Sequence, residues 1–269
     1  MRILLTNDDG VGSGLLAALA MQLDALGDVD VIAPAADMTG VSRSLSLQGP
    51  IAVDEIALPN GRPAFAVVGT PVDCVRFGAL GLAGGKPDVV ISGPNYGVNL
   101  GDDVAYSGTV AAALEGVMLG LPAIAVSQQS RTGEMDFRLG HVFDFTTAAA
   151  FAARVVDQLD DVPLPEGTLL NINVPGGTPR GVEVARLGKR IYQDELLLVE
   201  EEDGRRRFRV YGDSPVHEDE PGTDLSAVSE GRIAVTPLHF DLLATQGIDD
   251  LRAYDLEALL APAAEEVEE

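Results

Sequence analysis

Residues 2–34, RILLTNDDGVGSGLLAALAMQLDALGDVDVIAP, contain the pattern that decides the fold. Residues 2–6 are an apolar run typical of a buried strand, and residues 29–34 are a second such run. Between them, residues 13–26 place leucines at helical spacing, which predicts a helix. A strand, a helix and a strand within about 30 residues make a βαβ unit, so we expect a parallel sheet with a right-handed crossover.

The same alternation continues along the chain. We expect further strands at residues 51–56, 64–68, 89–91, 123–126 and 168–174, and helices at 71–83, 109–119 and 142–159. A glycine-rich loop is predicted between residues 93 and 107. Leu, Val and Ala dominate, as expected where strands are covered on both faces. The sequence therefore predicts an α/β fold, a Rossmann-like, parallel-rich sheet flanked by helices.

The pattern changes after about residue 188. Asp203-Gly204 lies between two extended runs, which is the strongest short signal for a β-hairpin. A two-residue loop places Glu200-Glu201-Glu202 opposite Arg205-Arg206-Arg207, and each opposite-charge pair contributes roughly 0.2–1 kcal/mol. A charged, disordered loop is the alternative. Because a lone hairpin is marginally stable, we expect the leucine-rich base at 196–199 to pack on another subunit or on the domain body.

These patterns divide the chain into three parts. Residues 1–187 form the α/β core, residues 188–248 form the hairpin arm and a return strand, and residues 249–269 form a C-terminal helix and an acidic tail. The helix itself is expected at about 249–261.

Composition restricts the partners of the chain. A net charge of -24 argues against binding to a nucleic acid duplex or to an anionic membrane. No apolar stretch is long enough to span a bilayer, and no signal peptide is apparent. Cys74 is the only cysteine, so no intrachain disulfide forms and a reducing compartment is indicated. We therefore expect a cytoplasmic location.

Asp8 and Asp9 stand at the end of the first predicted strand, where open α/β sheets bind ligands. Two adjacent carboxylates raise each other's pKa, and a divalent cation relieves their repulsion. This pattern favours a metal site with oxygen ligands. The alternative is that one of the aspartates caps the helix beginning near Gly12.

A second polar run, SGPNYGVNLGDDVAYSGT at residues 92–109, follows another predicted strand and so lies at the same sheet edge. Asn95 and Asn99 offer amide oxygens to a hard cation or N–H groups to an anion. Ser107-Gly108-Thr109 opens a helix, and a helix N-terminus attracts anions such as phosphate. Capping of that helix by Ser107 or Thr109 is the alternative reading.

Other catalytic motifs do not fit the sequence. Gly85-Lys86 lacks the preceding glycine and the following hydroxyl of a P-loop, and no G-x-S-x-G elbow exists. Position 15 is Leu where a dinucleotide fingerprint needs its third glycine. The histidines have no zinc spacing; they are His141, His217 and His239.

The chain resembles the SurE (survival protein E) family of divalent-metal-dependent nucleotide phosphatases over nearly its whole length. The resemblance rests on ordered motifs: Asn7-Asp8-Asp9-Gly10, Gly69-Thr70-Pro71, the run from Ser92 to Thr109, Leu170-Asn171-Ile172-Asn173-Val174-Pro175, Gly222-Thr223-Asp224 and Val235-Thr236-Pro237-Leu238. Two positions depart from the family pattern. Thr39 replaces the usual Ser but keeps a hydroxyl, and Pro94 stands where an aliphatic residue is common.

The resemblance implies a site and an activity. One Mg²⁺ or Mn²⁺ per subunit would be held by Asp8, Asp9, Thr39 and Asn95, with Asp8 and Asp9 also catalytic. Asn99, Ser107, Gly108 and Thr109 would surround the phosphate. The implied reaction is hydrolysis of nucleoside 5′- and 3′-monophosphates, and in some members of short polyphosphate. The implied assembly is a homodimer or homotetramer that exchanges the hairpin and the C-terminal helix.

Two rival functions remain open on the sequence alone. One is a metal-dependent nucleotide-binding or sensing module that does not turn its ligand over. The other is a dinucleotide-dependent dehydrogenase, which bound nicotinamide would reveal.

Overall fold

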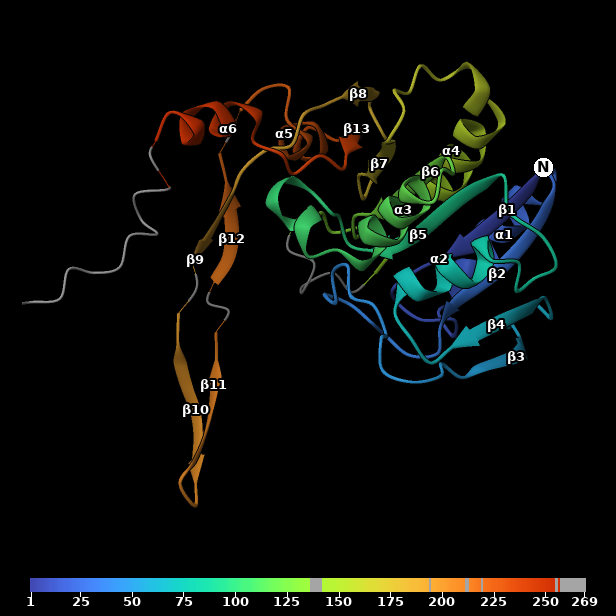
Figure 1. Ribbon diagram of the computed structural model, residues 1–269, viewed down its shortest axis with the longest axis horizontal. Helices are drawn as coiled ribbons and strands as arrows, with labels where there is room; N and C mark the ends of the chain where they lie inside the picture. Colours follow the sequence, from blue (N-terminus) through green and yellow to red (C-terminus); the bar gives the residue numbers. More distant parts are fainter. Residues whose placement is uncertain (136–141, 194, 211–212, 219, 255, 257–269) are drawn as a thin grey trace, which may run out of the picture. The chain divides into compact units, whose positions relative to one another are not determined.

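A mostly parallel β-sheet forms the centre of the protein. The computed structural model describes residues 1–269 except 136–141, 194, 211–212, 219, 255 and 257–269. It divides into two compact units, Met1–His239 and Phe240–Glu269. In the first unit, the described residues form a nine-stranded sheet in the order β3-β4-β2-β1-β5-β6-β7-β13-β8 (Figure 1). Its strands are β1 (Arg2–Thr6), β2 (Asp28–Pro34), β3 (Val53–Ala57), β4 (Pro63–Val67), β5 (Val89–Tyr96), β6 (Ala123–Gln128), β7 (Thr168–Val174), β8 (Val182–Val184) and β13 (Ile233–His239).

The strand order reverses beside β1. Neighbours from β4 through β2, β1, β5 and β6 to β7 are parallel, whereas β3 and β13 pair antiparallel with β4 and β7. The chain builds outward from β1 to β4 and then resumes on the other side of β1 with β5. The order therefore reverses between β1 and β5, and such switch points are the ligand sites of doubly wound sheets. The predicted α/β fold with a parallel-rich sheet is confirmed.

Helices cover both faces of this sheet. One apolar cluster contains residues of α1 (Gly14–Leu23) and α4 (Thr146–Asp157), and another contains residues of α2 (Pro71–Ala79) and α3 (Gly108–Met118). Strand β1 contributes to both, because successive strand residues point to opposite faces. Ile3 and Leu5 lie in the first cluster, and Leu4 lies in the second. Burial on both faces explains the near-continuous apolar run at the start of the chain.

Several predicted boundaries are wrong, and the most consequential concerns β5. The expected loop from residue 93 is still strand as far as Tyr96, because Asn95 pairs with Ser127 and Tyr96 with Gln128 after a break in register. Helices α1 and α2 are shorter than the predicted 13–26 and 71–83.

The helix expected at 142–159 begins only at Thr146. The Asp144 carboxylate accepts the Thr146 backbone N–H at 3.1 Å, so this turn is held by a side chain rather than by a helical bond. Phe143 and Phe145 therefore precede the helix.

The predicted hairpin is confirmed with its register. Strands β10 (Leu197–Glu202) and β11 (Arg205–Arg209) pair antiparallel, with Glu202 opposite Arg205, Glu201 opposite Arg206 and Glu200 opposite Arg207. Asp203 and Gly204 both have positive φ, as a type I′ turn requires. A second two-stranded sheet joins β9 (Arg190–Gln193) to β12 (Asp213–His217). The remaining short elements of this unit are η1 (Gly101–Ala105), η2 (Leu159–Asp161) and α5 (Asp224–Ser229).

The second unit contains the C-terminal helix. Helix α6 (Thr245–Arg252) begins earlier than the predicted residue 249, and its C-cap is Ala253. The predicted helical residues 257–261 lie outside the part of the chain that the structure describes. None of the helices built from described residues has the length and apolar character needed to cross a bilayer.

Candidate functional site

Asp8 lies at the carboxyl end of β1 and packs on the first turn of α3. Its side chain is almost fully buried, and its Oδ1 accepts a hydrogen bond of 2.5 Å from the Thr109 hydroxyl. A Cβ at position 108 would stand 2.8 Å from both Cβ and Oδ2 of Asp8, so only glycine permits this approach. Gly108 and Thr109 therefore place the Asp8 carboxylate directly against a helix N-terminus.

Asp9 is a largely buried carboxylate in an electrostatically unfavourable place. Burial, followed by the charges of Asp8 and Asp37, raises its pKa to about 8, although a backbone hydrogen bond from Tyr96 acts in the opposite direction. Its Oδ2 has no hydrogen-bond partner among the described residues. Burial also raises the pKa of Asp8. Buried carboxylates without a compensating charge are costly, so this pair is suited to a bound cation.

The turn between β1 and α1 is held by Asn7 rather than by the aspartates. The Asn7 side-chain amide donates to the Gly10 carbonyl at 3.2 Å and to the Ser13 hydroxyl at 2.8 Å. Ser13 is the N-cap of α1, and its side chain makes no capping hydrogen bond. The alternative that Asp8 or Asp9 caps α1 is therefore wrong.

The loop that carries Thr39 reaches the same sheet edge. The Met38 N–H donates to the Asp8 carbonyl at 2.7 Å, which ties the residue before Thr39 to the end of β1. The Thr39 hydroxyl is exposed and donates to Asp37 Oδ1 at 2.6 Å. Asp37, which sequence reasoning did not select, thus adds a third carboxylate to the charge around Asp8 and Asp9.

The side-chain amide of Asn95 uses its N–H groups in hydrogen bonds to the backbone and keeps its oxygen free of partners among the described residues. Its Nδ2 donates to the carbonyls of Tyr96 and Gly97 at 3.2 and 3.0 Å. This fixes the orientation of the buried amide and leaves Oδ1 as its ligand-competent atom. Since Tyr96 also contacts Asp9 through its backbone, Asn95 lies next to the carboxylate pair.

Asn99 is held by a network that the sequence reasoning did not anticipate. Its N–H donates to Asn173 Oδ1 at 2.8 Å, and its carbonyl accepts from the side chains of Asn171 and Asn173. Its own side chain donates to the Ser127 hydroxyl at 2.8 Å. A signal for this network is present in the sequence. Asn171 and Asn173 stand at alternate positions of an apolar strand, so both must lie on one face of β7.

Ser107 caps helix α3, which the sequence allowed as an alternative to anion binding. It is the N-cap of α3, and its hydroxyl oxygen accepts the Val110 N–H at 3.1 Å. The hydroxyl hydrogen is then still able to donate to an anion. Capping and anion binding are therefore compatible at Ser107.

Thr70, which belongs to the Gly69-Thr70-Pro71 motif, has a structural role together with Asp73. They form a reciprocal capping box at the start of α2. Asp73 also accepts a 2.7 Å hydrogen bond from the Ser46 hydroxyl, which ties the end of the Thr39-bearing loop to α2.

A buried ion pair holds the segment that leads into Ser107. Arg190 of β9 donates through Nε to Asp103 Oδ2 at 2.8 Å and through Nη2 to the Met135 carbonyl at 2.6 Å. The Tyr192 hydroxyl donates to the other oxygen of Asp103. This network holds η1 against β9.

The donor atoms at this edge match a hard divalent cation. The described residues contain no cluster of three or more His, Cys, Asp or Glu side chains placed to hold a metal. The donors here are instead two carboxylates with an amide oxygen and a hydroxyl nearby, and oxygen-only sets of this kind suit Mg²⁺ and Mn²⁺. The Oδ2 of Asp9, which has no partner among the described residues, is available to such a cation.

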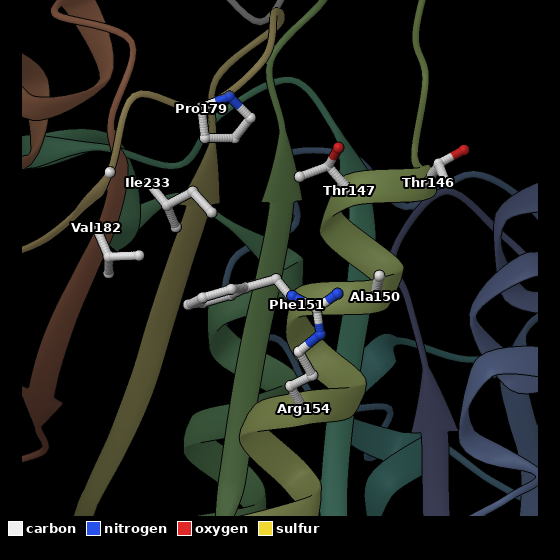
Figure 2. Close-up of a pocket in the computed structure, with 9 residues that line it drawn as sticks. Thr146, Thr147, Ala150, Phe151, Arg154, Pro179, Val182 and Ile233 are labelled. Atoms are coloured by element: carbon white, nitrogen blue, oxygen red, sulfur yellow. The ribbon is translucent and has the colours of Figure 1, made fainter.

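A cavity of about 400 Å³ lies elsewhere and contains none of the predicted site residues. Figure 2 shows residues of α4 on one side of it, and Pro179, Val182 and Ile233 on the other. Its lining is mainly apolar, with Arg154 as its charged member. Its lining contains no carboxylate or side-chain amide.

The fold and this geometry define a class: doubly wound α/β proteins whose polar ligand site lies where the strand order reverses. The chain belongs to the SurE family, since the family model for survival protein SurE matches residues 3–194. A protein of Rubrobacter xylanophilus called 5′-nucleotidase SurE is 43% identical over 97% of this chain and 99% of its own length. A protein of Chloroflexus aggregans with the same name is 42% identical over 96% of this chain and 100% of its own length. The crystal structure of the SurE protein from Aquifex aeolicus is 34% identical and superposes with a TM-score of 0.77, covering 94% of this chain and 99% of the other.

Proposed function

We propose that this chain, a phosphoric monoester hydrolase of the SurE family, releases phosphate from nucleoside 5′-monophosphates with the help of one divalent cation. Nucleoside 3′-monophosphates and short polyphosphate are further substrates in this proposal. The observation that carries it is the contact between Asp8 and Thr109, which joins a carboxylate pair to a helix N-terminus. A cation and a phosphate need these two environments side by side.

The proposed metal ligands are Asp8, Asp9, Thr39 and Asn95, and the cation is Mg²⁺ or Mn²⁺. When bound, it supplies Lewis acidity toward a phosphoryl oxygen and a water molecule of lowered pKa. The support is the donor set together with the raised pKa of Asp9, whose charged form needs a counter-ion. Thr39 joins the set through rotation of its hydroxyl away from Asp37.

The proposed phosphate site is formed by Asn99, Ser107, Gly108 and Thr109. The free N–H groups of the first turn of α3 and the Ser107 hydroxyl donate to phosphoryl oxygens, and the helix dipole favours their negative charge. These donors stabilise the charge that spreads over the oxygens in the transition state. The Asn99 side chain is oriented by Ser127, so it adds a donor at a fixed position.

Asp8 is the proposed base. Its carboxylate orients a water for in-line attack and takes one proton from it as the water oxygen bonds to phosphorus. The bond between phosphorus and the nucleoside oxygen breaks, and that oxygen takes a proton from solvent to become a hydroxyl. Thr109 holds Asp8 in one rotamer during this step. If Asp8 attacked phosphorus itself, a phosphate analogue would trap a covalent adduct on it.

The catalytic unit in this proposal is residues 1–187, and the remaining parts serve assembly. The hairpin exposes a row of large apolar side chains, namely Leu196, Leu197, Leu198, Val199 and Phe208. Exposed apolar clusters of this kind are typical of association surfaces. We propose a homodimer or homotetramer that exchanges the hairpin and the C-terminal helix. The substitution L198E should then lower the molar mass in light scattering, whereas R206Q on the polar part of the hairpin should not.

The test of the hydrolase is phosphate release from adenosine 5′-monophosphate with Mn²⁺, with and without a chelator. The variant D9N should lose at least 99% of the activity and keep its fold by circular dichroism. Asp54 is exposed on β3, so D54N serves as the matched control and should keep the wild-type rate. Tight nucleotide binding without any phosphate release would instead support the sensing module.

A further inference from the structure

Three aromatic rings meet at the carboxyl end of β5. Tyr96 meets Phe143 and Phe145 edge to face, with ring centroids 5.1 and 5.2 Å apart. The two phenylalanine rings are nearly parallel, with centroids 5.6 Å apart and an angle of 14° between them. This aromatic cluster has no part in the proposed chemistry at phosphorus.

The cluster lies beside the carboxylate pair. Tyr96 directly follows Asn95 in β5, and its backbone makes a hydrogen bond to Asp9. The Asp9 charge is close enough to the Tyr96 ring to help burial raise the pKa of the phenol. Tyr96 therefore borders the proposed metal site, and the rest of a nucleotide whose phosphate is bound there can extend over its ring.

Both phenylalanines are held in place by the backbone around them. The Arg131 N–H, just beyond the end of β6, donates to the Val142 carbonyl at 2.8 Å. Asp144, between the two rings, accepts the Thr146 N–H. These bonds hold the backbone on both sides of the two phenylalanines, and the contacts with Tyr96 and with each other orient their rings.

The cluster also remains open to solvent. Tyr96 is 40% exposed, and Phe143 and Phe145 are only partly buried. A cluster with a purely structural role would bury its rings, because each buried aromatic side chain adds apolar area to the core. Partly exposed, preorganised rings beside a polar site are typical of stacking surfaces for planar ligands.

We propose that Tyr96, Phe143 and Phe145 form the surface on which the base of the nucleotide stacks. This inference rests on the proposed function, because it places the phosphate of the same molecule at Asn99, Ser107, Gly108 and Thr109. Every base has an apolar π-face, so the surface accepts different bases. Purines cover more of the rings than pyrimidines, and they are the preferred substrates.

The test compares adenosine 5′-monophosphate with ribose 5-phosphate, which carries the same phosphate and sugar but no base. Wild type, F143A, F143L and F143W are assayed for phosphate release with Mn²⁺. We expect the ratio of kcat/KM for the two substrates to fall about tenfold in F143A and F143L through a higher KM for the nucleotide, as the loss of one stacking contact implies. F143W keeps a ring and should keep the ratio.

Two results would overturn the stacking surface. One is an F143A enzyme with wild-type kcat/KM on both substrates, and the other is an equal loss of kcat/KM on both substrates, which marks a structural role. If wild type releases no phosphate from either compound, the proposed hydrolase fails, and calorimetric titration with adenosine 5′-monophosphate decides separately. Weaker binding by F143A than by F143W then supports the surface, and equal binding refutes it.

Discussion

The Thr109 hydroxyl lies 2.5 Å from Asp8 Oδ1, although 101 residues separate them in the sequence. The contact joins the end of β1 to the beginning of α3, on either side of the switch point in the sheet. Since the acceptor is buried, losing the donor leaves a polar group unpaired. The properties of the site can therefore be tested by substitution of Thr109, which leaves every proposed metal ligand in place.

Removal of the Thr109 hydroxyl should slow turnover. Valine keeps the shape of threonine, so T109V deletes the donor to Asp8 and one donor beside the phosphate. Loss of a single donor of this kind typically lowers kcat by about 100-fold. T109S retains the hydroxyl and should stay within a few-fold of wild type in the same phosphate-release assay. Wild-type kcat in T109V would contradict the role given to this contact.

The close approach at Gly108 predicts an unusual glycine-to-alanine effect. Alanine is the better helix former, yet its Cβ would stand 2.8 Å from Asp8 Cβ and Oδ2. G108A should therefore displace Asp8 and lower Mn²⁺ affinity by at least tenfold in a calorimetric titration. Gly14 opens α1 with nothing within 4 Å of an added Cβ, so G14A should bind Mn²⁺ as the wild type does. Equal affinities in both variants would show that the approach is not required.

The raised pKa of Asp9 predicts that the metal-free protein loses stability as pH rises. The pKa is about 8 in the folded chain and 3.8 ordinarily, so between these values the folded chain holds a proton that the unfolded chain has released. The free energy of unfolding should therefore be highest below about pH 4 with respect to this group and should fall toward pH 8, by at most about 1.4 kcal/mol per pH unit.

Urea unfolding at a series of pH values, in the presence of a chelator, measures this dependence. D9N cannot titrate at this position, so its slope against pH should be smaller than that of the wild type. Saturating Mn²⁺ should also reduce the slope, because the cation replaces the proton. Parallel curves for wild type and D9N would assign the dependence to other groups.

The ion pair between Asp103 and Arg190 predicts a large change in stability. Both side chains are buried, so R190M leaves the Asp103 carboxylate without its charge partner. Breaking such a pair costs about 3 kcal/mol or more in the free energy of unfolding. The double variant D103L/R190M removes both charges and should recover part of that loss in urea unfolding. An additive loss in the double variant would mean that the two charges are not coupled.

Local patterns in the sequence predicted much of the fold. The βαβ unit follows from apolar spacing, and the hairpin register follows from Asp203-Gly204 with matched charges on both sides. Helix ends were less accurate, because side chains such as Asp144 compete for backbone hydrogen bonds in ways that periodicity does not express. Glycine and proline disfavour strands, so the sequence predicts a loop from residue 93. Pairing with β6 nevertheless extends β5 to Tyr96.

The sequence predicted which residues belong to the candidate site but not the hydrogen bonds that join them. Asp8, Asp9 and Ser107 could be assigned to one sheet edge, because parallel strands end together. The bond from Thr109 to Asp8 and the support of Asn99 by Asn171 depend on contacts between distant segments, which no local pattern encodes. The effect of Asp37 on Asp8 and Asp9 likewise depends on how its loop folds back over the end of β1.

The continuation of β5 as far as Tyr96 has an evolutionary consequence. Adjacent strand residues point to opposite faces, so the buried side chain of Asn95 and the 40% exposed side chain of Tyr96 leave β5 in different directions. Substitution at position 96 can therefore proceed without disturbing the amide at position 95. Related proteins that differ at position 96 can therefore differ in substrate preference while they keep the same reaction.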